Sequence, residues 1–383
     1  MGYNPEVFDI RRKIETVMRG ADQSCASPVA ATLYGVSTVY GAAQKLRAGC
    51  YRQKILPSRR LPCRVISVGN ITVGGTGKTP MTIFLAQELK QAGCRVAIVS
   101  RGYKGGAERQ GGIVSDGNCL LMDSQRAGDE PFMMAGRLKD IPVIVGKNRF
   151  EAGRLAVSKF QPDVIVLDDA FQHLQLKRDI DIVLLDHDQP FGNTHLLPRG
   201  ILREPLTAMK RATACILTRC RDDADENAQA SIATLKSILP ATPVFKSSSV
   251  PYCCTVNKGA LPPIPAASNF SAPQDLKDHK TRKVFGFSGI ARNDDFQRTV
   301  KTLGFNVTGF LEFSDHHRYA EPDLQTIVRT AGESGARQLI TTEKDYARLT
   351  AKGACPMDLV VVGVRAAFQD DGQGFITFIQ DRL

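Results

Sequence analysis

The stretch VGNITVGGTGKTP, residues 68–80, decides the fold of this chain. It follows a short, mostly β-branched run, Val65–Val68, which predicts a buried strand, and it precedes a segment of helical length, Pro80–Gln91. Glycines allow backbone N–H groups to wrap an anion, and the N-terminus of the following helix adds a partial positive charge. The pattern therefore predicts a phosphate-binding loop between a strand and a helix.

The residue types in this loop predict how a nucleotide is held. A lysine at position 78 can reach the β- and γ-phosphates, and the hydroxyl of Thr79 can ligate Mg²⁺. The usual motif has glycine where this chain has Thr72, so a chance glycine-rich turn is the alternative interpretation. We predict ATP and Mg²⁺ as cofactors, with the nucleotide held by Thr72, Val73, Gly74, Gly75, Thr76, Gly77, Lys78 and Thr79.

Short apolar runs recur along the chain at helical separations and predict further strands. They lie at residues 96–99, 164–167, 182–185 and 214–217, and later at 284–287, 307–313, 338–341 and 359–362. A less regular stretch runs from about residue 222 to 280. The rhythm predicts an α/β fold of the P-loop NTPase type, with a mostly parallel sheet flanked by helices and a second, smaller α/β domain.

The domain boundaries follow from the same spacing of predicted strands and helices. We predict an N-terminal helix and basic linker over residues 1–60, a phosphate-binding domain over 61–208, and a second α/β domain over 209–383 that completes the active-site cleft. The second boundary could also fall near Pro205 or after Arg221, because the sequence does not decide between these positions.

The N-terminal segment has an unusual charge pattern. No charged residue occurs from Gln23 to Gln44, and the spacing of five residues places them on one face of a helix: Val29, Leu33, Val36, Tyr40 and Ala43. A basic cluster follows: Lys45, Arg47, Arg52, Lys54, Arg59 and Arg60. The segment is too weakly apolar to span a membrane, but it suits an amphipathic helix on an anionic membrane surface. The alternative is a helix packed on the protein's own core.

Composition narrows the class of protein. The chain has 383 residues, 43% apolar and 23% charged, which suits two globular domains. A formal net charge of +11 favours an anionic partner, but no nucleic-acid-binding signature accompanies it. The ten cysteines include no C-x-x-C pair, and no signal peptide is evident, so we expect free thiols in a reducing cytosol.

Acidic residues end one predicted strand and occupy one short turn. Asp168 and Asp169 follow the apolar run 164–167, where a carboxylate can hold Mg²⁺ at the ligand side of a parallel sheet, although a helix cap is the alternative. His173 could face the same cleft. Asp129 and Glu130 precede a proline, and a carboxylate there could accept a hydroxyl proton, although such a pair is often a solvated turn.

Histidines and basic turns complete the candidate set. His316 and His317 follow Asp315, and a histidine beside a carboxylate could tune a base, with a surface loop as the alternative. Basic glycine-containing turns at residues 101–105, 146–149 and 197–200 offer cations to phosphate groups.

These motifs, in this order, resemble those of the tetraacyldisaccharide 4'-kinase family. The resemblance rests on residues 68–80, 100–103, 128–131, 168–173, 197–200, 287–290 and 315–317, and it runs from about residue 60 to 350. It implies transfer of the ATP γ-phosphoryl group to the 4'-hydroxyl of a lipid A disaccharide 1-phosphate. It also implies a peripheral or monotopic enzyme at the cytoplasmic face of the bacterial inner membrane, anchored by an N-terminal helix.

The resemblance also implies roles for individual residues. Asp129 would be the catalytic base, partnered by His316, and Lys78 would act on the phosphates. Magnesium and the phosphates would be served by Thr79, Asp168, Asp169 and Glu130. The sugar-phosphate head of the lipid would be served by Tyr103, Arg149, His173 and Arg199.

Two other classes of protein remain open at this point. A partitioning or switch ATPase has a similar loop, but it usually carries a second lysine early in that loop, and none lies between Gly69 and Gly77. A non-enzymatic basic membrane-binding protein would leave the loop idle. No nucleic acid and no obligate protein partner is predicted.

Overall fold

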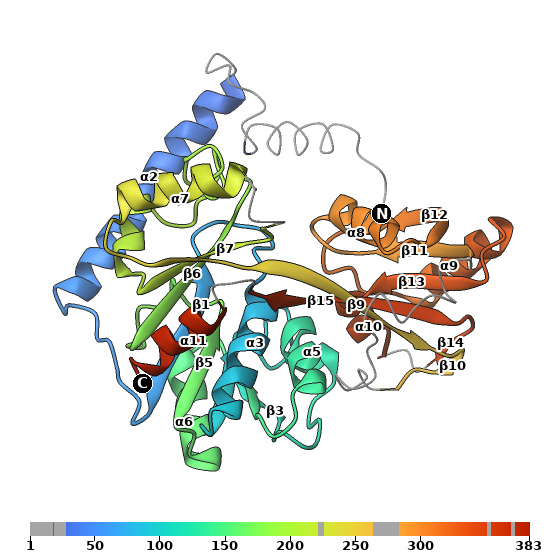
Figure 1. Ribbon diagram of the computed structural model, residues 1–383, viewed down its shortest axis with the longest axis horizontal. Coiled ribbons are helices and arrows are strands. Elements are labelled where there is room, and N and C mark those ends of the chain that lie inside the picture. The colour runs from blue at the N-terminus through green and yellow to red at the C-terminus, as the bar shows by residue number, and fades with distance from the viewer. Residues whose placement is uncertain (1–17, 19–27, 221–225, 263–282, 351–353, 369–371) are drawn as a thin grey trace. The chain divides into compact units, whose positions relative to one another are not determined.

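The computed structural model describes residue 18 and residues 28–220, 226–262, 283–350, 354–368 and 372–383. Its larger sheet has eight strands in the order β3-β4-β2-β5-β1-β6-β7-β8. Strands β1, β3, β5, β6 and β7 of this sheet are labelled in Figure 1. Their bounds are β1 Arg64–Asn70, β2 Val96–Ser100, β3 Gly112–Ser115, β4 Val143–Val145, β5 Val164–Asp168, β6 Ile180–Asp186, β7 Ala214–Thr218 and β8 Val244–Lys246.

Strand directions make this sheet mostly parallel. Parallel pairs join β2 to β4 and to β5, β1 to β6, β6 to β7, and β7 to β8, whereas β3 runs antiparallel to β4. The buried strands are rich in valine, isoleucine and leucine along their whole length, as expected for a parallel sheet with both faces covered. The predicted α/β fold is therefore confirmed.

The segments between these strands are mostly helical. The helix after the glycine-rich loop begins at Lys78, two residues before the predicted start, and Gly93 follows it with a positive φ of 89°. The helices are α3 Lys78–Gln91, α4 Ser124–Ala127, α5 Asp129–Arg137, α6 Arg149–Phe160, α7 Glu226–Ile238 and α11 Gly372–Gln380, with a 3₁₀ turn, η1, at Leu206–Arg211.

A second, five-stranded sheet has the order β12-β11-β13-β15-β9. Its strands are β9 Ser248–Val256, β11 Lys283–Ser288, β12 Asn306–Glu312, β13 Gln338–Thr342 and β15 Leu359–Ala367. The accompanying helices are α8 Asn293–Thr302, α9 Glu321–Glu333 and α10 Glu343–Leu349. A short antiparallel pair joins β10 Gly259–Ala260 to β14 Ala354–Cys355. The predicted second sheet is thus confirmed.

The chain forms two compact units, each built from separate segments. The first comprises Met1–Lys78, Asp169–Ser248 and Phe368–Leu383, and the second comprises Thr79–Asp168 and Ser249–Ala367. The predicted domain boundaries stay a prediction. Strands β7 and β8, which follow residue 208, hydrogen-bond within the larger sheet.

The stretch predicted to be less regular is partly ordered, and that prediction is wrong over residues 226–256. Helix α7 and strands β8 and β9 occupy this stretch. The sequence of α7, ENAQASIATLKSI, is rich in small residues and shows little contrast between apolar and polar positions, which hides its period. The described cysteines are all free thiols, as predicted.

Helix α2, Pro28–Arg52, covers most of the predicted N-terminal segment, whose residues 23–27 lie outside the described residues. Its buried face consists of Ala30, Ser37 and Gly41. A Cβ added at Gly41 would lie only 2.7 Å from the Leu196 side chain, so the small residue allows close approach. The helix therefore packs on its own compact unit.

The apolar stripe predicted for this helix is divided between protein and solvent. Leu33 and Tyr40 are half-buried, whereas Val29, Val36 and Ala43 are exposed. The interpretation of a helix packed on the protein is thus partly correct, because α2 packs through small residues, whereas its association with a membrane surface stays a prediction. None of the described helices is both long and apolar enough to cross a membrane.

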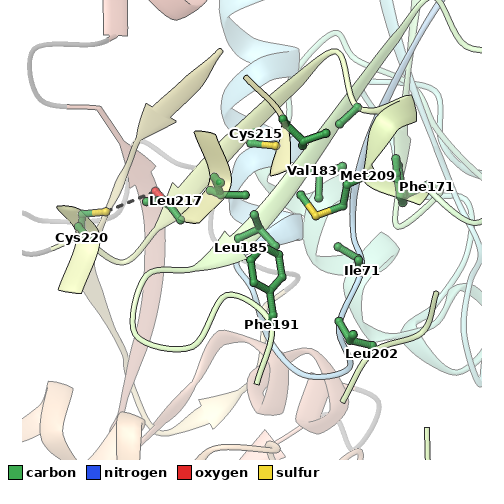
Figure 2. Close-up of a cluster of buried hydrophobic side chains, with 14 residues drawn as sticks. Ile71, Phe171, Val183, Leu185, Phe191, Leu202, Met209, Cys215, Leu217 and Cys220 are labelled. Carbon is green, nitrogen blue, oxygen red and sulfur yellow. Dashed lines mark hydrogen bonds between the residues drawn. The ribbon is translucent and has the colours of Figure 1, made fainter. Parts of the chain in front are cut away.

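A buried cluster holds the loops of the first unit in place (Figure 2). Ile71 lies on the approach to the glycine-rich loop, Phe171 follows the paired aspartates, and both have no exposed surface. They pack in one cluster with residues of β6 and β7, including Val183, Leu185 and Leu217. Burial of these side chains, at about 25 cal/mol per Å² of apolar surface, fixes the chain on both sides of the candidate site.

Candidate active site

The glycine-rich loop joins β1 to α3, as the sequence predicts. Gly74 and Gly77 have φ values of 109° and 79°, which side chains with a Cβ rarely adopt. At the end of β1, the buried Asn70 donates from Nδ2 to the hydroxyl of Thr76 over 3.0 Å. The loop can therefore direct successive N–H groups toward an anion at the start of α3.

Arg219, at the end of β7, braces the same loop. Its Nη2 atom donates to the carbonyl oxygen of Gly75 over 2.6 Å, and its Nη1 atom donates to Asp186 over 2.9 Å. A trans peptide points its C=O and the next N–H in opposite directions, so a fixed Gly75 carbonyl also fixes the N–H of Thr76. No sequence motif indicates this arginine, because 144 residues separate it from Gly75.

Lys78 and the second of the paired aspartates lie together. The Nζ atom of Lys78 is 3.8 Å from Oδ1 of Asp169. Arg203 also contacts Asp169, with Nη1 at 3.1 Å and 3.2 Å from the two carboxylate oxygens. The structure thus brings the loop lysine and the second aspartate together, and Arg203 is an additional cation there that the sequence did not single out.

Asp168 ends β5 and is only 1% exposed. Its carboxylate accepts from the hydroxyls of Thr82 at 3.3 Å and Ser100 at 3.1 Å. Thr79, at the start of α3, is likewise buried. Hydroxyl and carboxylate oxygens are the hard ligands that Mg²⁺ prefers, so the donor set fits that ion.

Asp129 and His316 meet in the second unit, although 187 residues separate them. Asp129 begins α5. His316 lies in the turn between β12 and α9 and has a φ of 61°. Nδ1 of His316 is 3.0 Å from Oδ2 of Asp129. A hydrogen on Nδ1 would be donated to this carboxylate, so the contact suits an imidazole that is protonated at Nδ1.

Helix α10 supplies a cation to each acid in the first turn of α5. Nε of Arg348 donates to Oδ2 of Asp129 over 2.7 Å, and Lys344 forms an ion pair with Glu130. Burial favours a higher pKa for Asp129, but the hydrogen bond from His316 and the charge of Arg348 outweigh it and lower that pKa. The carboxylate is therefore ionised at neutral pH. The sequence analysis did not single out either cation.

The residues predicted to bind the substrate occupy different surroundings. The ring of Tyr103 is half exposed and lies edge-on to His316, with ring centroids 5.6 Å apart. Arg149 is buried and donates to the carbonyl of Gly146 over 3.1 Å. The structure thus places Tyr103 beside the Asp129–His316 pair, while Arg149 stabilises its own loop.

The other two predicted substrate residues belong to the first unit. His173 lies in the turn that follows the paired aspartates, where its carbonyl accepts from Arg178 over 2.8 Å. Arg199 donates from Nη1 to the carbonyl of Ala30 over 3.2 Å and stacks on Tyr34. Arg199 therefore contacts helix α2.

Comparisons with known proteins cover nearly the whole chain. A family model described as Tetraacyldisaccharide-1-P 4'-kinase matches residues 29–383. The tetraacyldisaccharide 4'-kinase of Desulfatibacillum aliphaticivorans is 42% identical over 379 residues, which cover 98% of this chain and 98% of the relative. That of Syntrophus aciditrophicus is 42% identical over 329 residues, which cover 84% of this chain and 85% of the relative.

A solved structure agrees with these relatives. The crystal structure of the apo form of LpxK from Aquifex aeolicus in complex with ATP has a TM-score of 0.70 and 32% sequence identity, and the match covers 92% of this chain and 99% of that chain. The loop, the paired aspartates and the Asp129–His316 contact lie within the matched range. The chain belongs to the tetraacyldisaccharide 4'-kinase family.

Proposed function

We propose that this chain transfers the γ-phosphoryl group of ATP to the 4'-hydroxyl of a tetraacyldisaccharide 1-phosphate, a step of lipid A biosynthesis. Family membership supports the reaction, and the observation that carries it is the hydrogen bond between Asp129 and His316. A glycine-rich loop alone would serve ATP hydrolysis equally well. A carboxylate–imidazole pair is what an alcohol acceptor requires, because its proton must be removed as the new P–O bond forms.

The glycine-rich loop is our proposed ATP site. Its N–H groups surround the β-phosphate, and the ammonium of Lys78 follows the γ-phosphoryl group as charge develops on it. In the structure this ammonium lies near Asp169, which Arg203 also contacts. A bound triphosphate would compete with Asp169 for Lys78, and Arg203 would keep the carboxylate compensated.

Thr79 and Asp168 are our proposed ligands for Mg²⁺, directly or through water. The ion would neutralise charge on the β- and γ-phosphate oxygens. We also propose that Asp169 and Glu130 help to hold the ion, after each has exchanged its present partner. Each already has a cationic partner, Lys78 and Arg203 for the first and Lys344 for the second, which a metal would have to replace.

Asp129 is our proposed base. Among the residues that the structure describes, both hydrogen bonds to its carboxylate, from His316 and Arg348, go to Oδ2, so Oδ1 can accept a proton from the acceptor hydroxyl. The lowered pKa of Asp129 keeps it ionised. A weak base suffices in phosphoryl transfer, because the transition state is largely dissociative and leaves the protein little covalent chemistry to do.

Tyr103 is our proposed contact for the sugar head group, because it is half exposed beside His316. His173 is a second proposed contact. Arg149 and Arg199 each donate to backbone carbonyls of their own unit. Their predicted contacts with the head group would require these hydrogen bonds to be exchanged.

We further propose that helix α2 lies on the anionic cytoplasmic face of the inner membrane. Val36, Val39 and Leu46 follow one another at steps of three and seven, and they are 51%, 71% and 70% exposed. Lysine and arginine residues follow them along the chain. Exposed apolar side chains beside cations suit the interface between head groups and acyl chains.

The reaction is tested by incubating the protein with γ-³²P-labelled ATP and a tetraacyldisaccharide 1-phosphate. The proposal predicts a labelled lipid that carries a new phosphate monoester at the 4'-position. The Lys78→Ala variant is the negative control. Labelled inorganic phosphate without labelled lipid would contradict the proposal and favour a simple ATPase.

A further inference from the structure

Helix α10 directs two cations, one helical turn apart, at two adjacent acids. Lys344 and Arg348 are four residues apart and share a face of the helix. The first pairs with Glu130 and the second with Asp129, both in the first turn of α5. Each acid of this turn is thus matched to its own cation.

Arg348 is buried and donates hydrogen bonds to three groups. Its side chain is 5% exposed. Its Nη1 atom donates to Asp345 and to the carbonyl of Gly289, both over 2.8 Å, while Nε donates to Asp129 over 2.7 Å. The planar guanidinium therefore bridges two carboxylates and a carbonyl at fixed angles.

Asp345 anchors this bridge from the core. It has no exposed surface, and it accepts from the hydroxyl of Tyr319 over 2.9 Å and from the N–H of Gly289 over 3.1 Å. Thr342, the N-cap of α10, donates to it as well. A buried carboxylate with this many donors cannot move, so the guanidinium that it holds is also immobile.

We infer that Arg348, held by Asp345, is a positioning residue for phosphoryl transfer: it fixes the Asp129 carboxylate through Oδ2 so that Oδ1 faces the acceptor hydroxyl. The inference rests on the proposed role of Asp129 as the base. Without the bridge, the carboxylate would keep only its contact with His316, and it could rotate about its Cβ–Cγ bond. Misplacement of a catalytic group by about 1 Å can cost roughly 10²-fold in rate.

The Arg348→Lys substitution tests the geometry of the side chain separately from its charge. A lysine keeps the positive charge beside the buried Asp345, but its single ammonium lacks the fork of donors that spans both carboxylates. We therefore expect Arg348→Lys to fold and to lower kcat by about 10- to 100-fold, with the KM for ATP unchanged. Arg348→Met, which also removes the charge, should lower kcat further.

The test measures kcat and the KM for ATP in four variants with a tetraacyldisaccharide 1-phosphate as acceptor: Arg348→Lys, Asp129→Asn, the double variant, and Arg329→Met. Arg329 forms an exposed ion pair with Glu333 on α9, so its loss should change neither constant. The double variant should turn over no more slowly than Asp129→Asn, because an asparagine needs no bridge. Melting temperatures confirm that each variant is folded.

The outcomes separate the two ideas. If Asp129→Asn is severely impaired and Arg348→Lys turns over like the wild type, the positioning role is overturned and the base stands. A full further loss in the double variant also overturns the positioning role, because Arg348 would then act independently of Asp129. If Asp129→Asn itself turns over normally, the proposed base fails, and the inference fails with it.

Discussion

The glycine-rich loop and the Asp129 cluster differ in how far apart in the sequence their contacts lie. The loop obtains much of its shape from neighbours in sequence, namely glycines at positive φ and a contact between Asn70 and Thr76, six residues apart, and Arg219 braces it from a distance. The cluster is assembled from three distant segments, with 187 residues between Asp129 and His316 and 219 between Asp129 and Arg348. A loop shaped mainly by nearby residues suits the proposed site for ATP, a ligand that many proteins bind. The proposed acceptor site depends instead on the packing of the whole second unit.

The largest expected effect is on the glycine-rich loop. Lys78→Ala should lower kcat/KM for ATP by about 10³–10⁵-fold, the usual contribution of a cation that stabilises charge on the transferred phosphoryl group. The melting temperature should stay within a few degrees, since Lys78 is not part of the buried core. Label transfer to lipid measures the first quantity and calorimetry the second. Near wild-type turnover would remove the basis for an ATP site at this loop.

Next in size are the single variants of the assembled cluster. Asp129→Asn and His316→Ala should each lower kcat by about 10²–10⁴-fold, the usual contribution of a positioned base. The dissociation constant for ATP should change little, and equilibrium binding of a fluorescent ATP analogue measures it. A variant that loses ATP binding but keeps its turnover at saturation would mean that the cluster belongs to the nucleotide site.

A smaller effect should follow from the contact between Arg219 and the loop. Arg219→Ala frees the Gly75 carbonyl, and a hydrogen bond to a charged donor contributes about 1.5–3 kcal/mol, so ATP should bind roughly 10-fold more weakly or worse. Arg60→Ala, which removes an exposed ion pair with Asp179 in the same unit, is the matched control. Equal ATP affinities in the two variants would show that the loop needs no brace.

The smallest effect should appear outside both regions, on helix α2. Val39→Asp places a charge among the exposed apolar residues, whereas Thr38→Asp places it on another face of the same turn. Partial burial of a valine is worth about 1 kcal/mol, so Val39→Asp should weaken binding to anionic vesicles about 5-fold more than Thr38→Asp does. Equal binding of the two variants in vesicle sedimentation would contradict the membrane-facing side proposed here.

The contrast also explains what could be read from the sequence. The loop, its strand and its helix were predicted from adjacent residues, and short apolar runs located most strands of both sheets. Asp129 and His316 were candidates from their own neighbours in sequence, but their pairing came from a family resemblance, since no rule of spacing joins residues so far apart. Arg219 and Arg348 were missed because their partners are remote. One signal in the sequence pointed to the segment that contains Arg348. Charged residues directly follow the buried strand β13, and charges so close to a buried strand need partners.

The central claim is that Asp129 and His316 act as one unit in removing the acceptor proton. Single-turnover transfer from γ-³²P-labelled ATP, at saturating ATP and lipid, tests it most directly in the wild type, both single variants and the Asp129→Asn/His316→Ala double variant. The double variant should be no slower than the poorer single variant, because removing either member already disables the pair. Losses that multiply in the double variant would mean that the two residues contribute independently.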